Sequence, residues 1–271
     1  MNETLVRSGG RNVLRVERRV AHPPEKVWRA VTEPAELSAW FPSPVELDEL
    51  RPGAEIRFVG EGFGSAGTIA EVDPPRLFAF DWEGELLRFE LSPDGERGCL
   101  LVFTHTFDDR AGAASFAAGW DACLDALDGL LGGVAPPAQP PETSAAHEAF
   151  VRRFGLDEGT FEETADGWRI RFERQLTQHA PDVWPLVRAA ASADGERPTA
   201  VEQPRLIECA RDGGALHARW ELGQGTGQGA RLHLTVTATG AAAGPADAVL
   251  AAWSARVERL AADVTSRVPA A

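Results

Sequence analysis

The chain has 271 residues, and its 41 acidic residues outnumber its 27 basic residues, which gives a net charge of −14. This length suffices for two domains that each bury a core of their own. The negative charge excludes nucleic acid and anionic membranes as expected partners, because phosphate binding needs clustered Lys and Arg. No segment has the pattern of a signal peptide or a membrane span, so we expect a cytoplasmic protein.

The cysteines agree with that compartment. Cys99, Cys123 and Cys209 are odd in number, and no two of them form a Cys-x-x-Cys pair. This usage favours buried thiols over disulfides or a zinc site. We therefore expect neither a metal nor a cofactor.

The first half predicts a strand, two short helices and a run of further strands. Apolar residues alternate over residues 13–20, and Pro23 and Pro24 end this strand before a helix over residues 25–32. A second short helix is expected over residues 34–40. Strand patterns follow at residues 55–59, 68–72, 77–82, 86–91 and 100–107, separated by Gly, Pro and Asp clusters as in antiparallel sheets.

A long amphipathic helix follows these strands. Its apolar stripe recurs every three or four residues, at Phe116, Trp120, Leu124, Leu127 and Leu131. An acidic row, Asp121, Asp125 and Asp128, lies largely off this stripe. The row could hold a metal ion, but we favour a solvated helix face.

The second half repeats the first. The pattern of residues 14–20, with Trp28 after it, returns at residues 170–176 with Trp184, and Pro75-Arg76-Leu77 returns as Pro204-Arg205-Leu206. The offset is 156 positions at these tryptophans and 129 at the Pro-Arg-Leu motif, so the second copy lacks about 27 residues. A period this long indicates duplication of a whole domain.

The acidic segment 156–167 is the expected domain boundary, between a complete domain over residues 1–156 and a truncated one over residues 164–271. A helix over residues 146–154 would close the first domain. The second is expected to run strand, helix, three strands and a terminal helix over residues 246–264. It lacks the small helix before Trp40 and the first strands of the meander, so we expect a structural role, packed on the first copy or on another chain as a homodimer.

Several motifs of the first copy form a recognisable set: residues 20–28 (VAHPPEKVW), Trp40-Phe41, residues 67–69, residues 74–77, His105 and Gly119-Trp120. On these residues the chain resembles the START/Bet v1-like (SRPBCC) superfamily, and within it the family named for the activator of Hsp90 ATPase. The resemblance implies an α+β protein of two helix-grip domains. Each would be a curved antiparallel sheet around a long C-terminal helix, with a cavity between them, and the second copy would be degenerate.

Strand alternation places many rings on the face toward that helix. The candidate ligand-binding residues are Trp40, Phe41, Phe63, Phe78, Phe80, Trp82, Phe89, Phe103, His105 and Trp120. Plain core packing is the alternative for so many rings. The second copy lacks most of them, since Phe78 and Phe80 become Ile207 and Cys209, and we align Phe103 and His105 with Val236 and Ala238.

His105 is the one ionisable side chain that the pattern places on the ring-bearing face, as a polar anchor, an acid or base, or a structural histidine. Residues 62–67 (GFGSAG) match a dinucleotide-binding loop, but a strand follows them where that motif needs a helix. We interpret them as a hairpin loop with Phe63 at its tip. The chain has no tyrosine and no Gly-x-Ser-x-Gly motif, so we assign no catalytic residue.

The expected function is binding of a small hydrophobic molecule, aromatic or lipid-like, in the first domain, by a non-catalytic carrier with a sequestration or resistance role. The alternative is an enzyme like a polyketide cyclase or aromatase. A regulator of an Hsp90-type chaperone is a third candidate, disfavoured because we expect no room for a separate chaperone-binding domain. The richness in Ala, Arg and Gly suggests a bacterial source.

Overall fold

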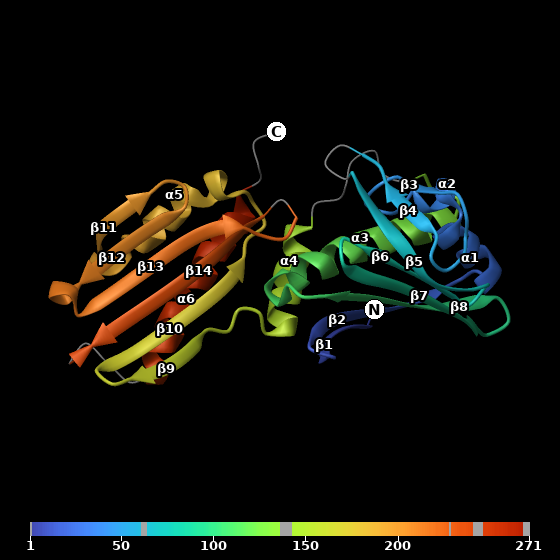
Figure 1. The fold of residues 1–271 in the computed structure, drawn as a ribbon. Helices are drawn as coiled ribbons and strands as arrows, with labels where there is room; N and C mark the ends of the chain where they lie inside the picture. Colours follow the sequence, from blue (N-terminus) through green and yellow to red (C-terminus); the bar gives the residue numbers. More distant parts are fainter. Residues whose placement is uncertain (1, 61–63, 136–142, 228, 241–245, 268–271) are drawn as a thin grey trace. The chain divides into compact units, whose positions relative to one another are not determined.

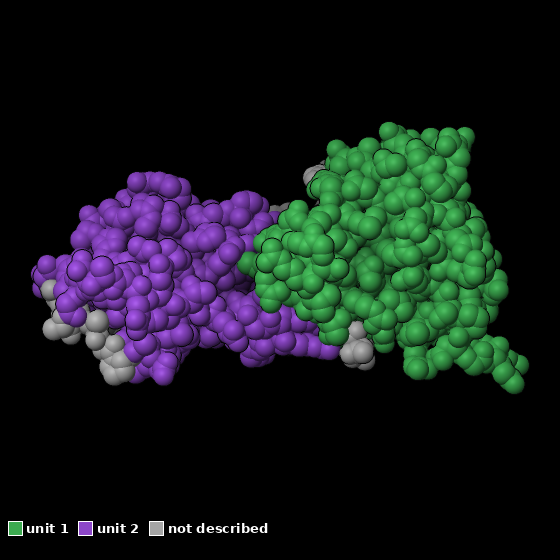
Figure 2. Space-filling model, turned by 60° about the horizontal axis from the view of Figure 1, so that its bottom comes forward, with its two compact units in different colours: residues 1–113, 117–143 green, residues 114–116, 144–271 purple. Residues whose placement is uncertain are grey.

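The computed structural model describes residues 2–60, 64–135, 143–227, 229–240 and 246–267. The chain divides into two compact units (Figure 2): unit 1 holds residues 1–113 and 117–143, and unit 2 holds residues 114–116 and 144–271. Among the described helices, none is both long and apolar enough to cross a membrane. Within the same ranges, no three His, Cys, Asp or Glu side chains gather closely enough to hold a metal ion.

Unit 1 is an eight-stranded antiparallel sheet with the long helix α3 against it (Figure 1). The strands lie in the order β1-β2-β8-β7-β6-β5-β4-β3. In chain order the elements are β1 (Asn2–Ser8), β2 (Arg11–Val20), α1 (Pro24–Thr32), α2 (Pro34–Leu37), β3 (Val45–Leu47), β4 (Glu55–Phe58), β5 (Ser65–Asp73), β6 (Leu77–Trp82), β7 (Glu85–Asp94), β8 (Gly98–Phe107) and α3 (Ala113–Leu131).

Unit 2 is a six-stranded antiparallel sheet with the long helix α6 along one face (Figure 1). The strands lie in the order β11-β12-β13-β14-β10-β9. In chain order the elements are α4 (Ser144–Phe154), β9 (Thr160–Thr164), β10 (Gly167–Gln175), α5 (Ala180–Ala191), β11 (Arg197–Glu202), β12 (Leu206–Arg211), β13 (Leu216–Gln224), β14 (Ala230–Thr239) and α6 (Ala246–Ser266).

The two units share one strand order. The run β1-β2-β8-β7-β6-β5 in unit 1 corresponds to β9-β10-β14-β13-β12-β11 in unit 2. In each unit the long helix, α3 or α6, follows the last strand of the sheet along the chain. Unit 2 has no counterpart of α2, β3 and β4 among its described residues. The predicted fold class is therefore confirmed: the protein is α+β, with two helix-grip domains of which the second is reduced.

The turn before β6 recurs in detail before β12. Its closing hydrogen bond runs from Arg76 N to Asp73 O at 2.7 Å, and from Arg205 N to Glu202 O at 2.7 Å. The next strand then donates to the same arginine, from Leu91 N to Arg76 O at 2.8 Å and from Leu222 N to Arg205 O at 2.7 Å. The repeated Pro-Arg-Leu motif is thus a repeated turn that joins three strands.

Several strands at the edges of the two sheets were not predicted from the sequence. Strand β11 precedes the three strands expected in the second copy, and its residues are mostly exposed. Strand β9 lies inside the segment expected as the boundary, where Phe161 packs on Trp168 with ring centroids 6.1 Å apart. An edge strand with a solvated face can have the acidic composition of a linker. Edge strands β1 and β3 are also additional to the predicted elements, and α2 ends at Leu37.

Helix α4 belongs to unit 2, whereas we expected this helix to close the first domain. The reason is electrostatic. Arg174 of β10 is buried, and its guanidinium pairs with Glu148 of α4. This ion pair is internal to unit 2 and attaches α4 to its sheet.

The thiols are sequestered as expected. Cys99 and Cys209 are fully buried and Cys123 is half-buried, and none of the three is in a disulfide. Burial raises the pKa of the Cys123 thiol to about 12. Thiols with such a pKa carry almost no thiolate near neutral pH and are poor nucleophiles.

Candidate functional site

Unit 1 gathers aromatic rings between its sheet and α3. Strands β6, β7 and β8 present them on one face because the register places Phe78 opposite Phe89, and Phe89 opposite Phe103. The segment after α2 and the helix α3 supply the facing rings. We call the following residues the aromatic cluster: Trp40, Phe41, Phe58, Phe78, Phe80, Trp82, Phe89, Phe103 and Trp120.

The rings of the cluster contact one another. Phe41 lies centrally, with its ring centroid 5.3 Å from that of Trp82 and 5.5 Å from that of Trp120. Phe103 and Trp120 are 4.7 Å apart, and Phe58 stacks on Trp82 at 4.7 Å. Such offset and tilted pairs add to the stability that burial alone provides. The cluster is therefore a continuous aromatic layer.

The cluster reaches solvent at Trp82. The other cluster rings are buried, including Phe80 and Phe103 at 0 % exposure, whereas Trp82 is half-buried. The Trp82 indole donates a hydrogen bond from Nε1 to Ser65 Oγ at 3.0 Å, which fixes the ring at the start of β5. Phe63, also proposed as a ligand contact, lies outside the described residues.

The structure adds two residues that sequence reasoning missed. Phe58 belongs to the cluster because alternation in β4 buries Ile56 and Phe58 together. Glu85 lies beside His105, so His105 is not the one ionisable side chain on this face. Alternation in β7 could have identified Glu85, because Glu85 lies on the same face of the strand as Leu87 and Phe89.

His105 is held by hydrogen bonds on both ring nitrogens. Trp120 Nε1, which can only donate, donates to His105 Nδ1 at 3.1 Å. His105 Nδ1 therefore carries no proton, and the proton of the neutral ring is on Nε2. That Nε2–H donates to Glu85 Oε2 at 2.7 Å. The arrangement orders the imidazole and leaves neither nitrogen available to exchange a proton with a ligand while both bonds are intact.

A tight turn sets Trp82 beside Glu85. The two residues are directly paired across β6 and β7, and the intervening Glu83 and Gly84 have φ of 55° and 83°. Positive φ at both central residues matches the twist of the flanking strands. Arg11 supports the turn from β2, donating from Nη2 to Gly84 O at 3.0 Å.

A cavity of about 430 Å³ lies on the opposite face of the same sheet. Its lining residues are Arg15, Asp73, Arg76, Leu77, Glu90, Leu91, Ser92 and Val102. Val102 lies between Leu101 and Phe103 in β8, so its side chain points away from the aromatic cluster. The predicted cavity was placed between sheet and helix, where the structure instead brings the rings together.

Strand registers correct the residue equivalences between the two copies. In unit 1 Phe103 pairs with Val16 and Phe89, and in unit 2 Leu234 pairs with the corresponding Phe172 and Trp220. Phe103 is therefore equivalent to Leu234, and by the same registers His105 is equivalent to Val236. The expected equivalences with Val236 and Ala238 were wrong by two residues, because the stretch from Phe89 to Phe103 and the stretch from Trp220 to Leu234 have the same length.

Comparisons with known proteins bear on unit 1. Residues 21–132 match the model of a family described as activator of Hsp90 ATPase homolog 1-like protein. No curated protein matches the chain.

Solved structures similar to this chain come from several bacteria. A conserved protein of unknown function from Enterococcus faecalis is 21 % identical, with a TM-score of 0.49 over 56 % of this chain and 89 % of its own. CalU16 from Micromonospora echinospora is 23 % identical, with a TM-score of 0.46 over 57 % of this chain and 95 % of its own. A protein from Bordetella parapertussis is 28 % identical, with a TM-score of 0.43 over 52 % of this chain and 86 % of its own.

The matched residues begin after β2 and run through the whole of α3, so they include the motifs on which the resemblance rests and every residue of the aromatic cluster. Residues 21–132 of this chain are therefore similar to the family of activator of Hsp90 ATPase homolog 1-like proteins.

Proposed function

We propose that unit 1 binds a small, largely apolar molecule against the aromatic cluster and acts as a non-catalytic carrier or sequestering protein. The observation that carries this proposal is the difference between unit 1 and unit 2 at equivalent positions of their sheets. Unit 2 builds the same strand order with aliphatic or small residues where unit 1 has rings: Ile207 for Phe78, Cys209 for Phe80 and Leu234 for Phe103. The fold itself does not require the rings.

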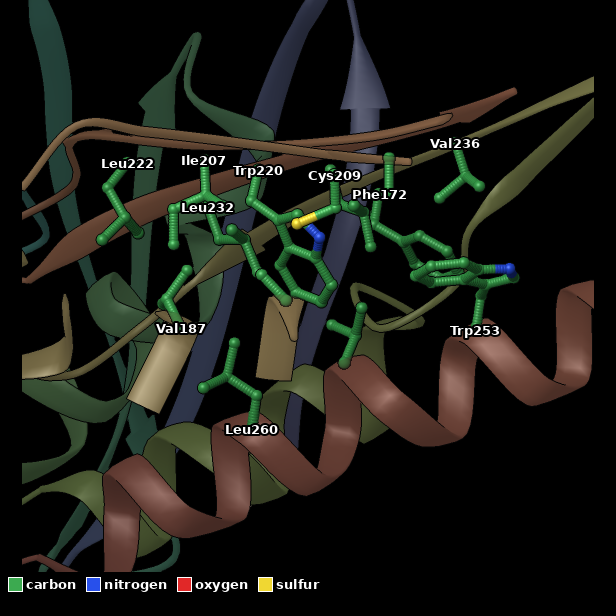
Figure 3. Packing of buried hydrophobic residues seen from close by; sticks show 14 of the residues in the cluster. Phe172, Val187, Ile207, Cys209, Trp220, Leu222, Leu232, Val236, Trp253 and Leu260 are labelled. Atoms are coloured by element: carbon green, nitrogen blue, oxygen red, sulfur yellow. The ribbon is translucent and has the colours of Figure 1, made fainter. Parts of the chain in front are cut away.

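The core of unit 2 is complete without them. Figure 3 shows Ile207 and Cys209 on the sheet, with Leu260 of α6 pointing toward it. These residues are buried, with Ile207 and Cys209 at 0 % exposure. The tryptophans that both units keep, Trp120 and Trp253 on the long helices, are part of the shared scaffold. The rings at Phe78, Phe80 and Phe103 are particular to unit 1, and they suit binding of an apolar ligand because rings offer large contact area with few rotatable bonds.

Trp82 is the proposed point of contact. It is the half-buried member of the cluster, and its ring stacks on Phe58 and lies 5.3 Å from Phe41. A ligand that packs against Trp82 reaches the buried rings when Trp82 or Phe41 rotates. Transfer of an apolar ring from water to such a surface is favourable by roughly 25 cal/mol per Å² of buried area.

The non-catalytic assignment is supported by His105. An acid or base must present a nitrogen to the reacting molecule, and both nitrogens of His105 are engaged, with Trp120 and with Glu85. His105 would therefore position Glu85 and Trp120 at the end of the cluster.

The test is a fluorescence titration of the full chain with N-phenyl-1-naphthylamine, an apolar probe that brightens when it leaves water. We expect saturable binding that Trp82→Ala weakens at least tenfold. The matched control is Phe161→Ala, which removes a half-buried ring from unit 2. Equal loss in both variants, or binding that Trp82→Ala leaves unchanged, would contradict the proposal.

A further inference from the structure

We infer that the ligand of unit 1 carries a hydrogen-bond donor, such as a hydroxyl or an amine, which the Glu85 carboxylate accepts, and that ligands with a carboxylate are disfavoured. This inference rests on the proposed function and names its ligand class. Its basis is the direction of a hydrogen-bond chain that runs from the interior of unit 1 to the exposed end of the aromatic cluster.

Every bond in this chain donates outward. Trp120 donates to His105 Nδ1, and His105 Nε2 donates to Glu85 Oε2. The indole can only donate, so the direction cannot be reversed while the imidazole is neutral. The group at the outer end is consequently an acceptor. His105 is buried with 2 % exposure, whereas the Glu85 side chain retains 29 % exposure.

Glu85 has acceptor capacity left. His105 binds Oε2, and no described residue donates to Oε1. A carboxylate offers lone pairs for further donors, and a charge-assisted hydrogen bond to it is roughly twice as strong as a neutral one. The cross-strand pairing of Trp82 and Glu85 places the Glu85 side chain on the same face as the half-buried Trp82 ring. A ligand stacked on Trp82 would therefore meet an acceptor at its edge.

The surrounding charge disfavours an anion. Asp81, Glu83 and Glu85 lie on one hairpin, and Arg11, whose guanidinium donates to Gly84 O, has its charge paired with Asp108 at 2.8 Å. A ligand carboxylate would add a further negative charge beside Glu85. The two carboxylates would repel each other. A ligand carboxylate also cannot donate a hydrogen bond, so the Glu85 oxygen would be left without a donor. Unit 2 has Leu216 and Val236 where unit 1 has Glu85 and His105, so the polar pair is not a requirement of the fold.

The experiment compares two molecules with the same ring system, 2-naphthol and 2-naphthoic acid, as competitors of N-phenyl-1-naphthylamine on the full chain at pH 7.5. We expect 2-naphthol to bind at least about tenfold more tightly, the factor that corresponds to one charged hydrogen bond. In Glu85→Gln this ratio should fall below threefold, because an amide donates as well as accepts. Glu83→Gln removes the same charge from the exposed turn but leaves the Glu85 acceptor in place, so it should lower the ratio less than Glu85→Gln does.

The outcomes separate this inference from the proposed function. If neither the probe nor either competitor binds, the proposed function fails and this inference with it. If both naphthalene derivatives bind with equal affinity, or the ratio survives in Glu85→Gln, ligand binding stands and the assignment of Glu85 is overturned. Each ratio is measured within one variant, so a loss of folded protein in Glu85→Gln does not alter it.

Discussion

Arg18 and Arg174 occupy equivalent positions in β2 and β10, and each buried guanidinium pairs with a carboxylate on the long helix of its own unit. Arg18 pairs with Asp121, and its Nη2 lies 3.6 Å from Asp125 Oδ1. Arg174 Nε lies 3.0 Å from Glu258 Oε1. Asp125 and Glu258 each follow the helix tryptophan by five residues. The acidic row of α3, expected to be solvated, in fact helps to attach this helix to the sheet.

Removal of Arg18 should destabilise unit 1 strongly. Glu3 is buried with 3 % exposure and its Oε1 lies 3.4 Å from Arg18 Nη1, so Arg18→Met would remove a cation from beside a buried carboxylate. We expect the free energy of unfolding to fall by about 3–5 kcal/mol in urea denaturation. Arg19→Met is the control, since its exposed pair with Asp94 should contribute less than about 1 kcal/mol. Equal effects of the two variants would refute the buried pair.

The stability of unit 2 should depend on His147 in mild acid. Burial, and then the positive charge of Arg174, lower the pKa of His147 from 6.5 to about 4. The unfolded chain therefore takes up a proton near pH 6.5 that the folded chain rejects until about pH 4. The free energy of unfolding should fall as pH drops across this window, by up to about 3 kcal/mol.

His147→Gln isolates this contribution. The variant cannot titrate, so its urea denaturation should change less between pH 7 and pH 4.5 than that of the parent chain. The difference between the two pH dependences is the measured quantity, because carboxylates contribute equally to both. Parallel dependences would show that His147 is not the group responsible.

The thiols should react slowly in the folded protein. Cys99 and Cys209 are fully buried, and burial raises the pKa of Cys123 to about 12. With Ellman's reagent at pH 8 we expect slow modification of the native chain and rapid reaction of all three cysteines in denaturant. Rapid stoichiometric labelling of the native chain would mean that a thiol is exposed or activated.

The tautomer of His105 can be determined from the NMR chemical shifts of its two ring nitrogens. The bond from Trp120 requires a bare Nδ1, and the bond to Glu85 requires the proton on Nε2. We expect the Nε2–H tautomer at pH 7.5, and a change of the Nδ1 shift in Trp120→Phe, which lacks the donor. A proton on Nδ1 in the parent chain is incompatible with the hydrogen-bond chain.

The features that could be predicted from the sequence are the buried faces of single strands and helices, because local periodicity determines them. Alternation in β2 and the apolar stripe of α3 are properties of one element, so the buried faces of both could be inferred. The rings on β6 and β8 were placed correctly on the inward face for the same reason. The edge strands β9 and β11 were missed, because a mostly exposed strand carries little alternation.

The candidate site was less predictable because it depends on register and on contacts between distant elements. The bond from Trp120 to His105 joins a helix to a strand, and no spacing in the sequence encodes it. Alternation in β7 could have placed Glu85 on the inward face. Its hydrogen bond with His105, however, depends on the register of β7 and β8, which the sequence does not show. The same registers moved the counterpart of Phe103 from Val236 to Leu234.

The most direct test of ligand binding by unit 1 uses the eight tryptophan indole N–H signals in a nitrogen-labelled sample titrated with N-phenyl-1-naphthylamine. Single Trp→Phe variants assign the signals. We predict that the Trp82 signal moves with saturation, and that the unit 2 signals of Trp168, Trp184, Trp220 and Trp253 stay in place. A Trp82 signal that does not respond, or shifts confined to the unit 2 tryptophans, would contradict the account.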